Sequence, residues 1–112
     1  MSYTILLGAR LVGCNGRNLG TITINKLDSA SLLYPYAPPG NKLSPNSIFN
    51  KFGSYGNQFN SMSAYNPVTT TPPSIVLNGT VIGYLTKNRA LTGAIDPDSL
   101  FEWLGIPPIN YS

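Results

Sequence analysis

The sequence predicts a mainly β fold, in which a small antiparallel sheet is wrapped by a long segment of turns and followed by one short C-terminal helix. An Asn-Gly turn motif flanked by apolar residues occurs twice, and its surroundings, residues 15–25 and 78–88, align at a constant offset of 63 residues. Asn-Gly favours tight hairpin turns, so two related hairpins are predicted. Between them a phrase recurs every 16 residues, which predicts repeated local structure.

With 112 residues the chain has the length of a single domain. We expect four regions: a first hairpin region over 1–25, a repeat segment over 25–75, a second hairpin with a short helix over 74–105, and an extended tail over 106–112. The tail contains Pro107 and Pro108, which disfavour regular hydrogen-bonded structure.

The first hairpin region begins with apolar runs over 3–7 and 10–13 that predict two strands. Asn15-Gly16 then predicts a type I′ turn, which needs positive φ at both residues, and residues 18–24 predict the returning strand. Because an isolated hairpin is marginally stable in water, we expect the two hairpins to pair into one sheet.

The repeated phrase occupies residues 25–31, 41–47 and 57–63. Its fourth position is a residue type that caps backbone N–H groups, and its last position is always serine. The caps are Asp28, Ser44 and Asn60, and the serines are Ser31, Ser47 and Ser63. We therefore expect each phrase to begin a single helical turn that is stopped by a following Pro or Gly.

Apolar residues follow each serine and need burial. We predict that the three serines occupy equivalent local structures, and that the apolar residues point the same way relative to their turns. These apolar positions are Leu32, Ile48 and Ala64, together with Leu43, Phe59 and Ile75.

A fourth, looser copy of the phrase begins at Asp96. Asp96 is followed by Pro97 at the first helical position and by Gly105 after the last apolar residue, Leu104. These are the start and stop features of a helix, so a short helix capped by Asp96 is predicted.

The middle of the chain resembles a group of bacterial proteins of unassigned function that carry runs of the type Asp-x-x-Ser-Ile-x-Asn-x-Tyr-Gly-x-Tyr-Gly-Ser. The matching residues are Ser47-Ile48, Asn50, Phe52-Gly53, Tyr55-Gly56, Ser63 and Asn66-Pro67, with Pro72-Pro73 before the second hairpin. The resemblance covers about residues 17 to 100, and the first repeat departs from it over 33–37. It implies no activity, ligand or catalytic residue. Members of that group are often exported.

Composition argues against several classes of function. Charged residues make up 10% of the chain, against roughly 25% in typical soluble domains. The net charge is +3, yet the basic residues are scattered, so no nucleic-acid partner is predicted. One Cys allows no internal disulfide, and no apolar stretch has the length of a membrane span.

The chain offers few residues for acid–base catalysis, because it contains no His and has four acidic residues in all. Asp96, Asp98 and Glu102 have the residue types for a hard cation, but the start of a helix already accounts for the two aspartates. Cys14 has no neighbouring base in the sequence and is interpreted as a small thiol beside a turn. We therefore predict no catalytic residue, no metal site and no cofactor.

The aromatic residues are the candidate binding residues. They are Tyr36, Phe49, Phe52, Tyr55, Phe59, Tyr65 and Tyr84. Core or protein-partner packing is the favoured interpretation, because several of them fall on apolar positions of the repeat. A row of exposed rings among Tyr36, Tyr55, Tyr65 and Tyr84 would instead favour a glycan, and stacking on bases is the third interpretation.

These features favour a non-catalytic structural or interaction protein that docks on a larger assembly, either as a virion accessory or decoration subunit or as part of a surface layer. Protein partners and homo-oligomers are expected. A carbohydrate-binding module is the alternative function, and a small enzyme is the third. The first residues lack the features of a signal peptide, which favours a virion or cytoplasmic location unless a leader precedes Met1.

Overall fold

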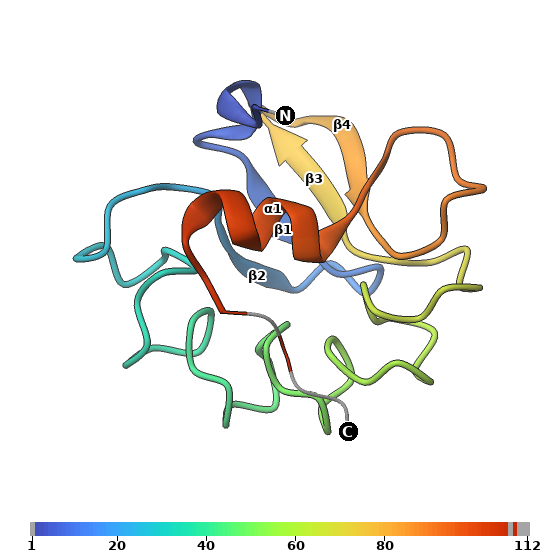
Figure 1. Cartoon of the computed structure of the whole chain (residues 1–112), viewed down its shortest axis with the longest axis horizontal. Coiled ribbons are helices and arrows are strands. Elements are labelled where there is room, and N and C mark those ends of the chain that lie inside the picture. Colours follow the sequence, from blue (N-terminus) through green and yellow to red (C-terminus); the bar gives the residue numbers. More distant parts are fainter. Residues whose placement is uncertain (1, 108, 110–112) are drawn as a thin grey trace.

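A computed structural model describes residues 2–107 and 109 of the chain. Its main element is a five-stranded mixed sheet with the strand order β2-β1-β3-β4-β5. The elements are a 3₁₀ helix η1 (Thr4–Leu6), strands β1 (Arg10–Val12), β2 (Asn18–Thr21), β3 (Ser74–Leu77), β4 (Thr80–Leu85) and β5 (Ala94–Ile95), and helix α1 (Pro97–Leu104). Figure 1 shows the segment between β2 and β3 running as a series of small loops around one side of the sheet and α1. The mainly β class is confirmed.

The sheet differs from the prediction in its composition and regularity. Strand β5 pairs parallel with β4, so the sheet is mixed and not purely antiparallel. Residues 3–7, predicted as a strand, contain η1, because successive N–H groups bond to carbonyls three residues back: Leu6 N to Tyr3 O and Leu7 N to Thr4 O. The returning strand predicted over 18–24 ends at Thr21.

The turns of the two hairpins differ. At Asn78-Gly79 both φ values are positive, at 52° and 80°, as a type I′ turn requires. In the first hairpin Asn78's counterpart, Asn15, does not have positive φ, so the predicted type I′ turn is wrong there. Gly16 N bonds to Gly13 O and Gly13 N bonds to Arg17 O, and only Gly16 is left-handed. This is the longer hairpin loop that ends in a glycine bulge.

The two hairpins nevertheless pair in a symmetric way. Strands β1 and β3 are antiparallel neighbours, with Leu11 opposite Ile75. Each of these two residues also faces a glycine on its hairpin partner, Gly20 and Gly83 respectively, and a shift of register follows in both hairpins. The hairpins are thus related by an approximate twofold axis through the Leu11–Ile75 pair, which matches the repeated sequence around the Asn-Gly motifs.

Residues 25–69, here called the turn ribbon, are a succession of hydrogen-bonded turns. Along most of the ribbon, every third residue is Asn, Asp, Ser or Thr. Its carbonyl accepts from the N–H three residues on, as in Ser44 O with Ser47 N at 3.1 Å. Its side-chain oxygen accepts from the N–H two residues on, as in Asn60 Oδ1 with Met62 N at 2.8 Å. These are the turns that short polar side chains form with their own backbone.

The predicted caps act in these turns. Asp28 Oδ1 accepts from Ala30 N at 2.9 Å, and Ser44 Oγ accepts from Asn46 N at 3.2 Å. The predicted single helical turns are wrong, because each side chain bonds the N–H two residues on and no α- or 3₁₀-helix forms in residues 25–69. A competing local turn replaces the helix start, as these residue types allow.

The three serines occupy equivalent positions, as predicted. Ser31, Ser47 and Ser63 are fully buried, and each Oγ accepts from the N–H two residues on at 2.9 to 3.1 Å. The following residues Leu32, Ile48 and Ala64 are all buried. The prediction that Leu43, Phe59 and Ile75 share one orientation is wrong. Leu43 and Phe59 are exposed, whereas Ile75 is buried in β3, beyond the end of the ribbon.

Within the 16-residue period the ribbon coils about every eight residues. The contacts of Gly40 and Gly56 show this shorter spacing. Each of these glycines packs against backbone carbonyls that lie six and eight residues earlier in the chain. A Cβ atom at Gly56 would clash with Asn50 O and Ile48 O, and one at Gly40 would clash with Tyr34 O and Leu32 O. Ser47 Oγ also donates to Pro39 O, eight residues back, at 3.3 Å. Neighbouring coils therefore touch backbone to backbone.

Helix α1 has the ends that the sequence predicts. Asp96 caps its start by accepting from Ser99 N at 3.0 Å, Pro97 is its first residue, and Gly105 ends it in the left-handed conformation. Its buried residues Leu100, Phe101 and Leu104 share one core with the sheet and the ribbon. No helix in the described part of the chain has the length and apolar character needed to cross a membrane.

Candidate functional site

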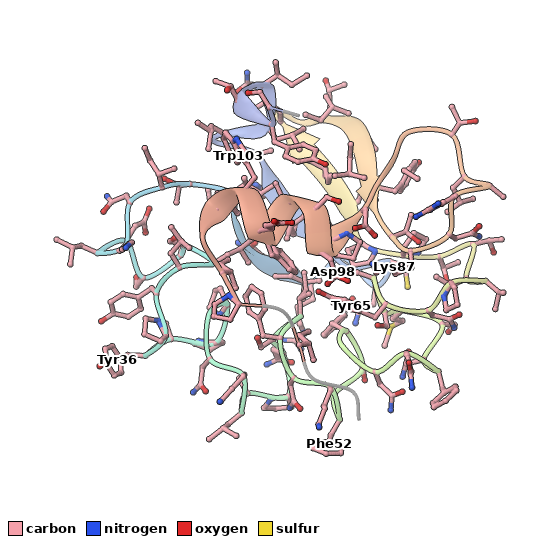
Figure 2. All side chains as sticks on the ribbon, in the orientation of Figure 1. Tyr36, Phe52, Tyr65, Lys87, Asp98 and Trp103 are labelled. Carbon is pink, nitrogen blue, oxygen red and sulfur yellow. The ribbon has the colours of Figure 1, made fainter. Side chains whose placement is uncertain are left out.

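The structure divides the predicted binding aromatics into two groups. Tyr36, Phe52 and Phe59 are almost fully exposed, and Figure 2 shows Tyr36 and Phe52 pointing outward from the ribbon. The other predicted residues lie inside the protein or partly inside it: Phe49, Tyr55 and Tyr65 are buried and Tyr84 is half-buried on β4. The aromatics therefore form no single row of rings.

The buried aromatics join the turn ribbon to the rest of the fold. Phe49 packs against Phe101 of α1, with ring centroids 4.8 Å apart. The Tyr65 hydroxyl donates to Asp98 Oδ1 at 3.1 Å, and the Tyr55 hydroxyl accepts from Asn15 Nδ2 at 2.8 Å. These contacts give Tyr55 and Tyr65 structural roles and leave their ring faces unavailable for stacking on a sugar.

The exposed aromatics belong to a larger set of apolar residues, here called the outer rim. Its members are Leu27, Tyr36, Leu43, Phe52, Phe59 and Val68, and their side chains are 78% to 87% exposed. They form two series with the 16-residue spacing of the repeat, 27–43–59 and 36–52–68. Each series places a large apolar side chain at the same position of successive repeats.

Local turn chemistry positions the rim. In five of the six cases an Asn stands two residues before the rim residue, and its Oδ1 accepts from the rim residue's N–H, as in Asn41 with Leu43 and Asn50 with Phe52. In these five turns the third residue is exposed. The sixth case is Tyr36, which follows Tyr34 and packs edge-on against it at 5.8 Å.

Leu27 and Val68 were not predicted as surface residues, and Leu43 and Phe59 were predicted to share the orientation of the buried residues. The triplet Asn-x-apolar was the available signal. It occurs with an exposed apolar residue at Asn25-Lys26-Leu27, Asn41-Lys42-Leu43, Asn50-Lys51-Phe52, Asn57-Gln58-Phe59 and Asn66-Pro67-Val68. It also occurs at Asn46-Ser47-Ile48 and Asn60-Ser61-Met62, where the apolar residue packs in or against the core, so the triplet alone does not identify the rim. A period of three inside the period of 16 separates these exposed residues from the buried ones that follow each serine.

The charge on the ribbon is positive. Lys26, Lys42 and Lys51 each precede a rim residue, and Lys51 Nζ lies 5.3 Å from the centre of the Phe52 ring. Asp28 is the one acidic residue between positions 25 and 69. The rim therefore combines exposed apolar groups with ammonium groups.

The acidic residues gather instead at the start of α1. Lys87 Nζ lies 2.7 Å from both Asp96 Oδ1 and Asp98 Oδ2 (Figure 2). Burial opposes ionisation of Asp96, but hydrogen bonds from Lys87 and Ser99 outweigh it and lower the pKa of the Asp96 carboxyl. Burial likewise opposes protonation of Lys87, and the two carboxylates raise the pKa of its ammonium group. This cluster fixes the helix start against the loop after β4.

The chemistry-bearing residues are few. Across residues 2–107 and 109, no group of three His, Cys, Asp or Glu side chains lies close enough together to hold a metal ion. Cys14 is a free, exposed thiol at the first hairpin turn. Comparison with protein families, characterised proteins and solved structures finds no match to this chain.

Proposed function

We propose that this protein is a non-catalytic structural or interaction protein that docks on a larger protein assembly through its outer rim. The observation that carries the proposal is the regular exposure of the six rim residues at equivalent positions of the repeat. Single exposed apolar residues are normal on a protein surface, and the proposal rests on the recurrence of six of them at two fixed positions of the repeat.

The composition of the rim supports a protein partner. Large aromatic and aliphatic side chains supply most of the binding energy of protein interfaces, and Phe52, Phe59 and Tyr36 are of this type. The partner surface should be apolar with some negative charge, because Lys26 and Lys42 flank the rim residues. A second copy of the chain or a shell or layer protein is the expected partner, such as in a virion or at a cell surface.

Burial of Tyr55 and Tyr65 weakens the alternative of a carbohydrate-binding module. The expected row of exposed rings drew on four tyrosines, and burial removes these two of the four. Of the remaining two, Tyr36 is exposed on the ribbon and Tyr84 is half-buried on β4. The rim therefore favours docking on protein over stacking on sugars.

Native mass spectrometry and sedimentation of the purified chain test the proposal, together with affinity capture from the particle or layer fraction of the source cells. We expect self-association or a retained partner for the wild type, and loss of either in the double variant Phe52→Ser, Phe59→Ser. The matched control is Ile5→Ser, since Ile5 is 81% exposed but lies on η1, outside the rim. A monodisperse monomer that retains no rim-dependent partner would count against the proposal.

A further inference from the structure

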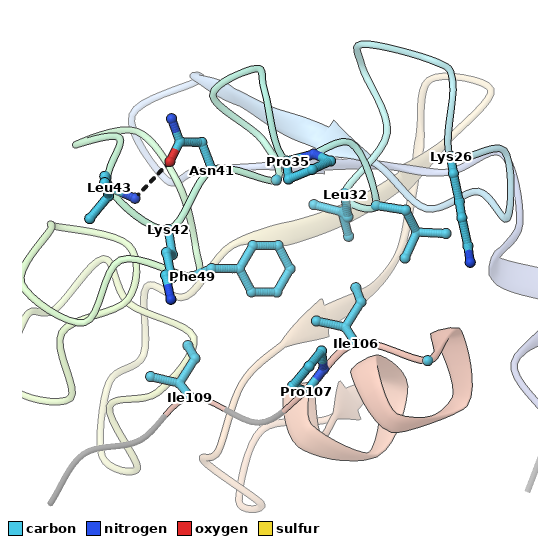
Figure 3. Close-up of a pocket in the computed structure, with 13 residues that line it drawn as sticks. Lys26, Leu32, Pro35, Asn41, Lys42, Leu43, Phe49, Ile106, Pro107 and Ile109 are labelled. Atoms are coloured by element: carbon cyan, nitrogen blue, oxygen red, sulfur yellow. Dashed lines mark hydrogen bonds between the residues drawn. The ribbon is translucent and has the colours of Figure 1, made fainter.

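A pocket of about 550 Å³ lies between the first half of the turn ribbon and the segment that follows α1. Figure 3 shows Leu32 and Phe49 from the ribbon on one side of it and Ile106 from the segment after α1 on the other. This volume is within the range of about 300 to 1,000 Å³ that is typical of small-molecule sites. The pocket is separate from the Phe52 and Phe59 side chains of the rim.

The body of the pocket is apolar. Leu32 and Phe49 are buried in the core and present part of their side chains to the pocket, and the half-buried Leu33 and Ile106 complete its walls. A hydrocarbon placed among these side chains would lose contact with water on the side that faces them, and removal of apolar surface from water favours binding of an apolar ligand.

Two ammonium groups stand at the edge of this apolar lining. Lys26 and Lys42 occupy the same position of successive repeats, and Figure 3 shows them on opposite sides of Leu32 and Phe49. The described lining contains no Asp or Glu. Neither lysine forms an ion pair within residues 2–107 and 109, in contrast to Lys87, whose two carboxylate partners satisfy its charge.

We propose that this pocket binds an amphiphilic anion, namely a single hydrocarbon chain that ends in a carboxylate. The chain would pack against Leu32, Leu33, Phe49 and Ile106, and the carboxylate would accept charge-assisted hydrogen bonds from Lys26 or Lys42. A lysine ammonium is a flexible point charge that suits a single terminal carboxylate. This inference does not rest on the proposed docking, although Leu43, Lys26 and Lys42 belong both to the rim region and to the pocket lining.

Calorimetric titration with dodecanoate below its micelle concentration tests the proposal, with dodecyltrimethylammonium as the probe of opposite charge. We expect dodecanoate to bind and the cationic probe to bind at least about tenfold more weakly. Chemical-shift changes in ¹H–¹⁵N spectra should map to residues 32–33, 42–43 and 106. Thermal unfolding of every variant by circular dichroism establishes that its fold is retained.

The double variant Lys26→Gln, Lys42→Gln should bind dodecanoate about tenfold more weakly, because both candidate partners of the carboxylate are lost. Lys51→Gln is the matched control for one lysine, since Lys51 also precedes a rim residue but does not line the pocket. It should retain wild-type affinity. Leu33→Trp, which fills the pocket from a half-buried position, should abolish binding.

Equal binding of the two probes, or an equal loss in Lys51→Gln and in the double variant, would overturn the proposal. So would shift changes confined to residues 52, 59 and 68 of the rim, or tighter binding of an acidic peptide than of dodecanoate. Docking is tested separately with Phe52 and Phe59, and neither residue lines the pocket. Failure of one proposal therefore leaves the other to its own test.

Discussion

The hydroxyl of Tyr55 accepts a 2.8 Å hydrogen bond from the side-chain amide of Asn15, which lies 40 residues earlier in the chain. Tyr55 belongs to the turn ribbon and Asn15 to the turn of the first hairpin. Asn15 also holds its own turn, because its Oδ1 accepts from Arg17 N at 3.3 Å. One amide thus shapes the hairpin turn and fixes the ribbon to it.

Tyr55→Phe removes this hydrogen bond while keeping the buried ring. We expect a loss of about 1 kcal/mol in the free energy of unfolding, measured by urea denaturation, since the Asn15 amide then loses its partner. Tyr36→Phe is the control, because Tyr36 is exposed, and it should change stability by less than about 0.5 kcal/mol. Equal effects of the two substitutions would contradict a structural role for the Tyr55 hydroxyl.

Gly56→Ala should destabilise the protein by about 3 kcal/mol, because the added methyl group meets two backbone carbonyls that cannot rotate away. Gly53→Ala is the matched control in the same coil. Its Cβ would approach Pro45 O at 3.1 Å, which a small backbone shift relieves, so it should cost clearly less. Urea denaturation measures both, and a Gly56→Ala variant as stable as Gly53→Ala would disprove the close backbone contact between coils.

Asn60→Ala should cost about 1 kcal/mol, as the loss of a side-chain cap usually does. The variant leaves Met62 N without the 2.8 Å bond to Asn60 Oδ1. The neighbouring Ser61→Ala is the control for a general effect of alanine in the ribbon. Thr69 and Thr71 donate hydrogen bonds to the backbone carbonyl of Ser61, and the substitution keeps that carbonyl. Thermal unfolding should show Ser61→Ala close to wild type, and a comparable loss in both variants would be inconsistent with the capping role.

Acid should weaken the start of α1. The pKa of Asp96 is lowered in the folded protein, so its stabilising effect is complete above the ordinary pKa of an aspartate and is lost as the pH falls through the lowered value. The unfolding midpoint in urea should drop between about pH 5 and about pH 2.5. Asp96→Asn keeps a capping residue but should show a smaller drop, as should Lys87→Met, and an unchanged drop in both would refute the linkage.

At high pH the sign is reversed for the same cluster. The raised pKa of Lys87 means that its contribution is complete below its ordinary pKa of 10.5 and is lost as the pH rises through the folded value. Stability measured above about pH 10.5 should therefore fall more steeply for the wild type than for Lys87→Met. Parallel curves for the two proteins would show that the ion pairs contribute no pH-dependent stability.

Two phenylalanines three residues apart should respond very differently to truncation. Phe49 is buried against Phe101, so Phe49→Ala should cost about 3 to 5 kcal/mol. Phe52 is 83% exposed, and Phe52→Ala should change stability by less than about 0.5 kcal/mol. Chemical denaturation of the two variants tests the division of aromatics between core and rim, and similar losses would place Phe52 in the core.

Much of this fold was predictable, because the local backbone preferences of particular residues determine its turns and helix ends. The turn at Asn78-Gly79, the cap at Asp96 and the equivalent turns of Ser31, Ser47 and Ser63 follow from the geometry that those residues prefer. Residues 3–7 were misassigned because an apolar run of five residues does not distinguish a strand from a turn of 3₁₀ helix. Strand β5 has two residues and no periodic pattern, so tertiary pairing alone defines it.

The candidate site was predictable only in part. Aromatic residue type does not separate Phe49 from Phe52, since both follow a polar turn residue closely. The distinction lies in which turn residue precedes each ring. Phe49 stands two positions after the buried Ser47 of the repeat and is buried, whereas Phe52 stands two positions after Asn50 and is exposed. The pocket depends on the placement of Ile106 beside the ribbon, which is a long-range contact that no local pattern specifies.

The turn ribbon has a consequence for the order of folding. Each of its turns closes over four residues, whereas the Leu11–Ile75 pair at the centre of the sheet joins positions 64 residues apart. Because local contacts form faster than distant ones, we expect the ribbon to coil before β1 meets β3. A coiled ribbon shortens the loop that this pairing must close and so lowers its entropic cost. The rate of sheet assembly is then set by the turn-forming asparagines and serines, although none of them between residues 25 and 69 belongs to a strand.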